Sequence, residues 1–198
     1  MSGYLELIFG PMFSGKTTYL INKYNQCLQN NNTVAVINFA DDKRYNDTML
    51  SSHDKVMIPC IFTRTLSTII NTEEVTCSDI ILINEGQFFD DLYESVVCLV
   101  EKLNKRVYIC GLDGDFKRKK FGTILDLLPL SDKITKLAAK CDKCNGSAIF
   151  SHRITNERQQ VVIGSNNYVP LCRSCYLNNN HELETTSEYH TDLLLDVL

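Results

Sequence analysis

Near its start the chain reads Gly10-Pro11-Met12-Phe13-Ser14-Gly15-Lys16-Thr17. Two glycines flank four residues and are followed by Lys and Thr, which is the spacing of a phosphate-binding loop. In such a loop successive backbone N–H groups point at one phosphate chain, beside the positive end of a helix. Lys16 is then expected to reach the outer phosphates and Thr17 to bind Mg²⁺. The motif predicts a nucleotide-binding protein.

The residues on either side fit a unit of strand, loop and helix. Tyr4–Phe9 is a short apolar run suited to a strand. After the loop, apolar residues recur at helical spacing: Leu20, Ile21, Tyr24, Cys27 and Leu28. The alternative is a glycine-rich turn followed by a surface lysine. The order of strand, loop and helix favours the phosphate-binding loop.

Further segments alternate between strand and helix patterns. Thr33–Phe39, Ile80–Ile83 and Arg106–Cys110 are apolar and suit buried strands. A shorter strand is predicted within 56–60, and a short helix within 65–70. Apolar residues with helical spacing follow at Leu92, Val96, Val97, Val100 and Leu103. The pattern predicts an α/β fold in which a parallel sheet is flanked by helices.

The strand predicted at Ile80–Ile83 ends at two polar residues, Asn84 and Glu85. They are expected at the same sheet edge as the phosphate-binding loop. An Asp at this point usually holds Mg²⁺, often through water, so the neutral Asn84 is expected to be a weak, water-mediated Mg²⁺ ligand. Glu85 is a candidate general base for an attacking hydroxyl group. An exposed carboxylate without a catalytic role is the alternative.

A loop from Gly111 to Phe121 follows the strand predicted at Arg106–Cys110. Its basic run, 117–120, resembles a nucleic-acid-binding patch. The chain has a formal charge of −4 and a pI near 5.6, which favours a solvated loop or one that neutralises a triphosphate. Phe116 and Phe121 flank this run and suit either the core or a base-stacking pocket.

Four of the nine cysteines form two C-x-x-C pairs, Cys141/Cys144 and Cys172/Cys175. Four thiolates fit a structural, tetrahedral Zn²⁺ site, while redox dithiols or free thiols are the alternatives. Between the pairs, 148–154 and 159–163 suit two strands, joined by a short connection and followed by a loop at 164–168. We therefore predict three parts: a nucleotide-binding domain over 1–140, a zinc-binding β-ribbon domain over 141–177, and a flexible tail over 178–198.

Composition favours a soluble protein of the cytoplasm. Charged residues make up 22% of the chain and apolar residues 44%, which is typical of a globular domain. No apolar stretch approaches the roughly 20 residues that span a bilayer, and the N-terminus lacks a basic region. We therefore expect no membrane partner, and the acidic balance gives no general attraction to nucleic acid.

The motifs, taken in this order, resemble those of the class II thymidine kinases, the cytosolic type found in cells and in large DNA viruses. The resemblance spans roughly Tyr4 to Tyr176 and rests on GPMFSGKT (10–17), NEGQFF (84–89), LDGDFKRKKF (112–121), CDKC (141–144), VVIG (161–164) and CRSC (172–175). It implies transfer of the γ-phosphate of ATP to the 5′-hydroxyl of thymidine. It also implies Mg²⁺, a zinc lobe whose lasso loop covers the base, and a homotetramer.

The same resemblance implies roles for individual residues. Glu85 matches the general base, Lys16 and Thr17 match phosphate and Mg²⁺ contacts, and Arg44 resembles a residue near the transferred phosphate. Positions that match the nucleoside pocket are Met12, Phe88, Leu112, Phe116, Phe121, Ser151 and Tyr168. The lasso segment, whose backbone would read the thymine edge, comprises Gln160, Val161, Val162, Ile163 and Gly164.

Two alternative functions stay open at this point. One is a zinc-ribbon ATPase that acts on nucleic acid, although no motor motif accompanies the phosphate-binding loop. The other is a non-catalytic nucleotide sensor in which Asn84, at a position where the family usually has Asp, marks lost activity.

Overall fold

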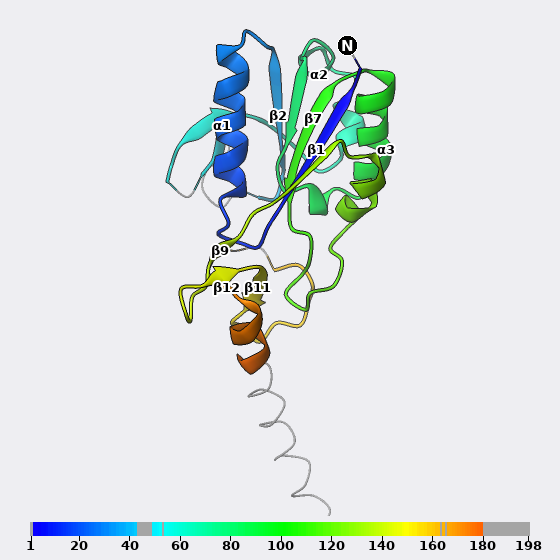
Figure 1. The fold of residues 1–198 in the computed structure, drawn as a ribbon. Coiled ribbons are helices and arrows are strands. Elements are labelled where there is room, and N and C mark those ends of the chain that lie inside the picture. Colours follow the sequence, from blue (N-terminus) through cyan, green and yellow to red (C-terminus); the bar gives the residue numbers. More distant parts are fainter. Residues whose placement is uncertain (1, 43–48, 53, 163, 165, 180–198) are drawn as a thin grey trace, which may run out of the picture.

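The computed structural model describes residues 2–42, 49–52, 54–162, 164 and 166–179. Its main body is a six-stranded sheet in the order β5-β2-β6-β7-β1-β8, and every pair of neighbours is parallel (Figure 1). The strands are β1 (Tyr4–Phe9), β2 (Val34–Phe39), β5 (Ile61–Thr63), β6 (Ile80–Ile83), β7 (Arg106–Gly111) and β8 (Lys133–Lys136). The predicted fold class, a parallel sheet flanked by helices, is confirmed.

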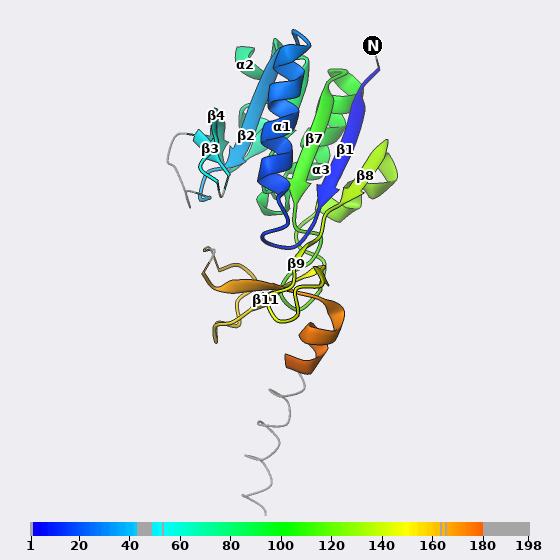
Figure 2. The same cartoon turned by 60° about the vertical axis from the view of Figure 1, so that its left-hand side comes forward.

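Helices cover both faces of this sheet, as Figure 2 shows with α1 in front and α3 behind. One face packs against α1 (Lys16–Gln29) and the hairpin of β3 (Met49–Ser51) and β4 (Met57–Pro59). The other packs against η1 (Leu66–Thr68), α2 (Glu73–Thr76), α3 (Leu92–Val97) and η4 (Ile124–Leu130). Because both faces are buried, the central strands are mostly apolar, with a few polar residues such as Glu6 in β1 and Asn38 in β2.

Most predicted elements of the main body are confirmed, with two differences. The helix predicted from Leu92 to Leu103 is an α-helix only to Val97, after which η3 (Cys98–Lys102) continues as a π-helical turn. Strands β3, β5 and β8 and helices α2 and η4 were not predicted. β8 lies at the sheet edge, and Ile134 within it is 52% exposed, so this strand lacks the apolar pattern of a buried one.

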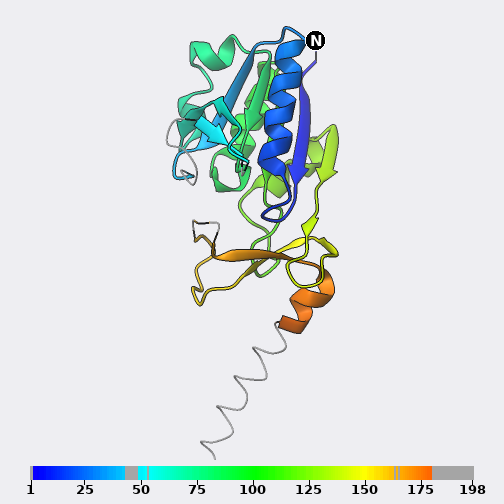
Figure 3. The same ribbon diagram turned by 90° about the vertical axis from the view of Figure 1, so that its left-hand side faces the viewer.

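A small lobe lies beyond the carboxyl ends of the sheet strands (Figure 3). It contains two short antiparallel pairs, β9 (Ala139–Lys140) with β10 (Ser147–Ala148) and β11 (Phe150–Arg153) with β12 (Tyr168–Leu171). Residues 173–179 are helical. The lobe has its own small apolar cluster, comprising Ala139, Cys141, Ala148, Leu171 and Tyr176. No helix within the described ranges is long and apolar enough to cross a membrane.

The strand predicted at 159–163 is wrong over its described part. Residues 159–162 form no strand, and β11 pairs instead with β12, which follows the loop. The backbone carbonyls of Gln159 and Gln160 accept hydrogen bonds from the guanidinium group of Arg153 rather than from a neighbouring strand. Residue 163, and the predicted tail from residue 180 onward, lie outside the described residues.

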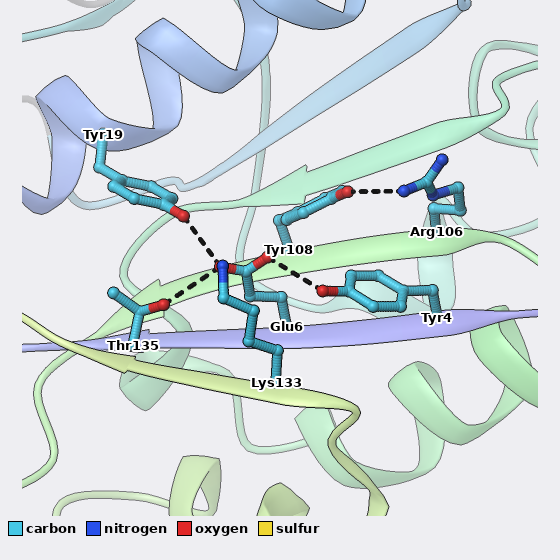
Figure 4. A network of polar contacts seen from close by, with 7 residues as sticks. All are labelled: Tyr4, Glu6, Tyr19, Arg106, Tyr108, Lys133 and Thr135. Atoms are coloured by element: carbon cyan, nitrogen blue, oxygen red, sulfur yellow. Dashed lines mark hydrogen bonds and ion pairs between the residues drawn. The ribbon is translucent and has the colours of Figure 1, made fainter.

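A charged side chain is buried within the sheet itself, in β1. Glu6 is 2% exposed, and four donors from three elements converge on its carboxylate (Figure 4). Its Oε1 accepts hydrogen bonds from the Tyr19 hydroxyl (2.8 Å), Lys133 Nζ (3.0 Å) and Thr135 Oγ1 (3.2 Å), and Oε2 accepts from the Tyr4 hydroxyl (3.2 Å). Burial alone would raise the pKa of Glu6, but the hydrogen bonds from Lys133 and Tyr19 lower it below its ordinary value. The cluster ties α1 and the edge strand β8 to the centre of the sheet.

Replacing Glu6 by Gln should lower the free energy of unfolding at pH 7 by about 1–3 kcal/mol, since charged hydrogen bonds are lost and buried hydroxyl groups lose an acceptor. Because the pKa of Glu6 is lowered in the folded state, its contribution is present above the unfolded pKa of about 4.3 and is lost as pH falls through the folded pKa. Urea denaturation from pH 7 to pH 3 should therefore show the difference between the variant and the native protein shrinking with acid. Glu94→Gln, at an exposed site on α3, is the matched control; a Glu6→Gln effect no larger than this control would contradict the prediction.

Candidate active site

The phosphate-binding loop joins β1 to α1, and two of its positions require glycine. A Cβ atom at Gly10 would lie 2.4 Å from Ser14 Oγ and 2.9 Å from the Leu137 carbonyl oxygen. Gly15 has φ +82°, a left-handed conformation that side chains disfavour. The first turn of α1 carries no acidic residue, so no carboxylate of that turn repels a bound anion or competes with it for the helix N-terminus.

Two polar side chains of the loop fit a phosphate. The Lys16 side chain is buried, and its Nζ donates hydrogen bonds to the carbonyl oxygens of Gly10 (3.0 Å) and Pro11 (2.8 Å). Its ammonium group is thereby placed inside the curve of the loop. The buried Oγ of Ser14 has no hydrogen-bond partner within the described part of the chain. A buried hydroxyl group left without a partner is costly, and a bound phosphate oxygen would satisfy it.

Glu85 follows β6 in an unusual backbone conformation. Its φ of 55° and ψ of 43° are left-handed, which is uncommon for residues other than glycine and is found preferentially at functional sites. The Phe88 N–H donates to the Glu85 carbonyl oxygen (3.0 Å) and so closes the turn η2 (Gly86–Phe88). The carboxylate accepts a 2.6 Å hydrogen bond at Oε2 from Gln87 Nε2 and is 8% exposed.

Asn84, beside it, is oriented by a chain of amide hydrogen bonds. Asn38 Nδ2 donates to the Asp42 carbonyl oxygen (3.2 Å), so Asn38 Oδ1 is the atom that accepts from Asn84 Nδ2 (2.9 Å). The remaining polar atom of Asn84 is then an oxygen. Together with the hydroxyl of Thr17, this provides hard oxygen donors of the kind that Mg²⁺ prefers.

A pocket joins the phosphate-binding loop, the end of β6 and the small lobe. Predicted site residues that line it are Met12, Phe13, Ser14, Gly15, Lys16, Thr17, Asn84, Glu85, Phe88, Leu112, Phe116, Phe121, Ser151, Gln160, Val161, Val162, Gly164 and Tyr168. Gly10 and Pro11 belong to the loop without lining the pocket. Arg44 and Ile163 lie outside the described residues. Six lining residues were not predicted: Thr18, Phe39, Asp42, Ser51, Gly114 and Asp115.

Aromatic rings form one wall of the pocket. Phe88 packs edge to face on Phe121, with ring centroids 5.4 Å apart. The ring of Phe88 also packs against that of Phe39, with centroids 5.2 Å apart. The Arg153 guanidinium lies 3.8 Å from the centroid of Phe116. A wall of this kind suits a flat, partly apolar ligand such as a nucleobase.

Arg153, in β11, holds the loop between β11 and β12, which contributes residues of the small lobe to the pocket. It is 5% exposed, and its Nη1 donates to the carbonyl oxygens of Glu157 (2.8 Å) and Gln159. Its Nη2 donates to the Gln160 carbonyl oxygen (3.0 Å) and to the Tyr168 hydroxyl. One planar guanidinium thus fixes both sides of the loop between β11 and β12.

Hydrogen bonds link the small lobe to the main body around the pocket. The Met12 N–H donates to Ser151 Oγ (2.9 Å), and Gln160 Nε2 donates to Asp115 Oδ2 (2.9 Å). The Tyr176 hydroxyl donates to the Phe116 carbonyl oxygen (2.6 Å). The phosphate-binding loop, the 112–121 loop and the segment at 160 are therefore positioned relative to one another.

The four paired cysteines converge in the small lobe. The sulfur atoms of Cys141, Cys144, Cys172 and Cys175 all lie within 4.8 Å of one another, and those of Cys144 and Cys172 are 3.6 Å apart. A tetrahedral zinc site with Zn–S bonds of about 2.3 Å separates its sulfurs by about 3.8 Å. Burial opposes ionisation of Cys141, yet backbone N–H groups of Cys172, Cys144 and Lys143 lower its pKa to about 6. The donor set and its spacing fit a Zn²⁺ ion.

Comparison with known proteins identifies the family. A family model described as thymidine kinase matches residues 3–176. The chain belongs to the thymidine kinase family. A thymidine kinase of Oryza sativa subsp. japonica is 38% identical over 189 residues, which cover 93% of this chain and 70% of the plant protein. Thymidine kinases of Yaba monkey tumor virus (strain VR587) and vaccinia virus (strain Western Reserve) are each 38% identical, over 91% and 89% of this chain and 98% of each viral protein.

Besides the six lining residues, two residues that support this thymidine kinase site, Arg153 and Gln87, were not predicted from the sequence, and for Arg153 the sequence pattern did hold a signal. Arg153 lies two residues after Ser151 in β11, so both side chains are on the same face of the strand. Ser151 was predicted to line the pocket, and strand periodicity therefore pointed to Arg153 as well. Gln87 had no such signal, because its role depends on the three-dimensional neighbours of Glu85.

Replacing Arg153 by Met should raise the KM for thymidine about tenfold or more, because the hydrogen bonds that a buried charged group makes to the loop are lost. The KM for ATP should stay within about twofold, since Arg153 contacts no residue of the phosphate-binding loop. Steady-state kinetics with each substrate varied in turn measures both. Arg158→Met, at an exposed position in the same loop, is the matched control. An unchanged thymidine KM in Arg153→Met would show that the guanidinium does not hold the site closed.

Replacing Cys144 by Ser should lower the bound metal to well below one equivalent and lower the melting temperature, because a small lobe of this size depends on its metal for stability. Elemental analysis of purified protein and thermal unfolding with and without a chelator provide the measurements. Cys77→Ser changes an exposed cysteine away from the cluster and is the control. A native protein that contains no metal, and whose unfolding is insensitive to chelator, would refute a metal site here.

Proposed function

We propose that this chain transfers the γ-phosphate of ATP to the 5′-hydroxyl group of thymidine, giving dTMP and ADP. One observation carries the proposal: the phosphate-binding loop and Glu85 line the same pocket, and an aromatic wall forms its other side. Donor and acceptor sites are thus adjacent, as phosphoryl transfer requires. Membership of the thymidine kinase family supports thymidine as the acceptor.

The donor half of the site stabilises charge. Phosphoryl transfer passes through a loose transition state with charge spread over the transferred group, so positioning and electrostatics contribute most of the rate. Lys16 and the N–H groups of the loop are proposed to contact the phosphates. When bound, Mg²⁺ would be held by Thr17 and, through water, by Asn84, and would neutralise phosphate charge. Asn84 brings no negative charge, so it is expected to hold Mg²⁺ less strongly than an Asp at this position would.

The acceptor half contains Glu85. We assign it the general-base role: it orients the 5′-hydroxyl group and accepts its proton as the bond to phosphorus forms. Its burial and its turn-constrained backbone support this role, because a base must be held at a fixed place beside the phosphate. Arg44 is proposed to lie near the transferred phosphate, on resemblance alone.

The nucleoside is proposed to bind between the aromatic wall and the lasso segment. Side chains assigned to this pocket are Met12, Phe88, Leu112, Phe116, Phe121, Ser151 and Tyr168. The backbone of 160–164 is proposed to hydrogen-bond the edge of the base. The loop is already hydrogen-bonded to Arg153 and Asp115 in the protein without ligand. Less conformational entropy is therefore lost when the nucleoside binds.

Other features are also proposed. A homotetramer rests on resemblance alone, and a cytoplasmic location rests on composition. A structural Zn²⁺ in the small lobe rests on the four clustered cysteines, and a division into parts at residues 140 and 177 rests on the sequence pattern. A nucleic-acid-dependent ATPase is not favoured, because the family match extends over residues 3–176 and the chain is acidic. A non-catalytic sensor is not favoured, because the carboxylate of Glu85 lines the pocket.

The test is to incubate the protein with γ-labelled ATP, Mg²⁺ and each deoxynucleoside in turn, and to separate the products. Labelled 5′-monophosphate should form with thymidine and to a smaller extent with the other deoxynucleosides. ATP hydrolysis that DNA stimulates and thymidine does not would favour the ATPase. Tight ATP binding with no labelled nucleotide would favour the sensor.

In the same assay, Glu85→Gln should lower kcat by about 10²- to 10⁴-fold, the range expected for loss of a general base. ATP binding, followed by equilibrium titration, should change little because the phosphate-binding loop is untouched. Turnover close to that of the native protein would remove Glu85 from this role.

A further inference from the structure

Gln87 has a buried polar side chain, and the proposed mechanism assigns it no role. It is 3% exposed and lies in η2, the turn between the Glu85 carboxylate and the aromatic wall at Phe88. Burying an amide is costly unless its polar atoms are hydrogen-bonded, so its partners indicate what it does.

The two ends of the amide have different partners, and this fixes its orientation. The Leu112 backbone N–H can only donate, and it donates to Gln87 Oε1 (2.9 Å). The amide nitrogen is therefore the atom directed at Glu85, where it donates to Oε2 at 2.6 Å. If the amide were flipped, an oxygen would face the carboxylate and a nitrogen would face an N–H group. Glu85 thus receives a donor whose direction is set by the 112–121 loop.

Close backbone packing holds this arrangement in place. A Cβ atom on Gly111 would come within 2.7 Å of Gln87 Oε1, and one on Gly122 would come within 2.1 Å of the Gln87 carbonyl oxygen. Glycine therefore stands at both ends of the 112–121 loop where it passes Gln87. The same loop supplies Leu112, Phe116 and Phe121 to the pocket.

We propose that Gln87 is a positioning residue that fixes the Glu85 carboxylate toward the acceptor and ties its orientation to the loop that lines the nucleoside pocket. A glutamate side chain has several rotatable bonds, and without a fixed donor it samples orientations in which the hydroxyl group is out of reach. The inference rests on the proposed base role of Glu85. It adds that one side chain, Gln87, connects the base Glu85 to the loop that lines the nucleoside pocket, so that the two are positioned together.

A double-mutant cycle tests the inference. Gln87→Met keeps the length of the side chain and removes its donor, and should lower kcat about 10- to 100-fold, as expected when a reacting group is misplaced by about an ångström. In a Glu85→Gln background the same substitution should cost less than about threefold, because there is no longer a base to orient. The KM for ATP should change little in either background.

Matched variants separate positioning from folding. Gln29→Met, at the exposed end of α1, is the control for the same chemical change, and thermal unfolding of every variant monitors the fold. Should Gln87→Met not fold, Gln87→Glu preserves the shape, replaces the donor by an acceptor, and should give the same non-additive loss. Native kcat in the folded Gln87 variant would overturn the inference, and so would an equal loss in both backgrounds, which indicates a structural role independent of Glu85. If Glu85→Gln alone turns over normally, the base assignment fails first and the inference fails with it.

Discussion

Strands β6, β7 and β1 lie side by side and run in the same direction, so their carboxyl ends meet at one edge of the sheet. The part of the site that the main body supplies follows from that constraint. β1 leads into the phosphate-binding loop, β6 ends at Glu85, and β7 leads into the loop that carries Phe116 and Phe121. Three segments that are far apart in the chain are thereby brought within the span of one nucleotide and one nucleoside. The pairing of their strands in the sheet fixes their relative positions.

The sheet has the stability to hold local features that are unfavourable by themselves. Both faces of the central strands are buried under helices, and this apolar burial is the main source of folding free energy. Against it stand the left-handed backbone of Glu85 and the buried Ser14 hydroxyl, which has no hydrogen-bond partner among the described residues. Both follow strand ends and line the pocket, whereas the charge buried in the middle of β1, Glu6, has its hydrogen bonds supplied within the protein. The charged group inside the sheet is compensated by the chain, and the unfavourable features lie at the edge of the sheet, beside the pocket.

Sequence patterns predicted the central strands and the positions of Lys16, Glu85 and the four cysteines, because these depend on local signals: apolar runs, glycine spacing and paired C-x-x-C motifs. They failed where tertiary contacts decide. β8 is exposed and short, so it has no apolar signature and becomes a strand only because β1 is available as a neighbour. Residues 159–162 have the composition of a strand, but Arg153 takes up their carbonyl groups. Gln87 and Arg153 escaped prediction for the same reason, since each acts through a hydrogen bond to a residue distant in space or chain.

The way in which the lasso segment is held has a consequence for catalysis. A strand added to a sheet would be fixed by a ladder of backbone bonds and would open only with the fold itself. Here the described part of the segment is held by side-chain hydrogen bonds: the Gln160 carbonyl oxygen accepts from Arg153, the Val162 carbonyl oxygen accepts from the Tyr168 hydroxyl, and the Gln160 amide donates to Asp115. A region held by few bonds of this kind opens at a free energy far below that of global unfolding. The segment can therefore open to admit substrate or release product without disturbing the sheet that positions Glu85 and Lys16.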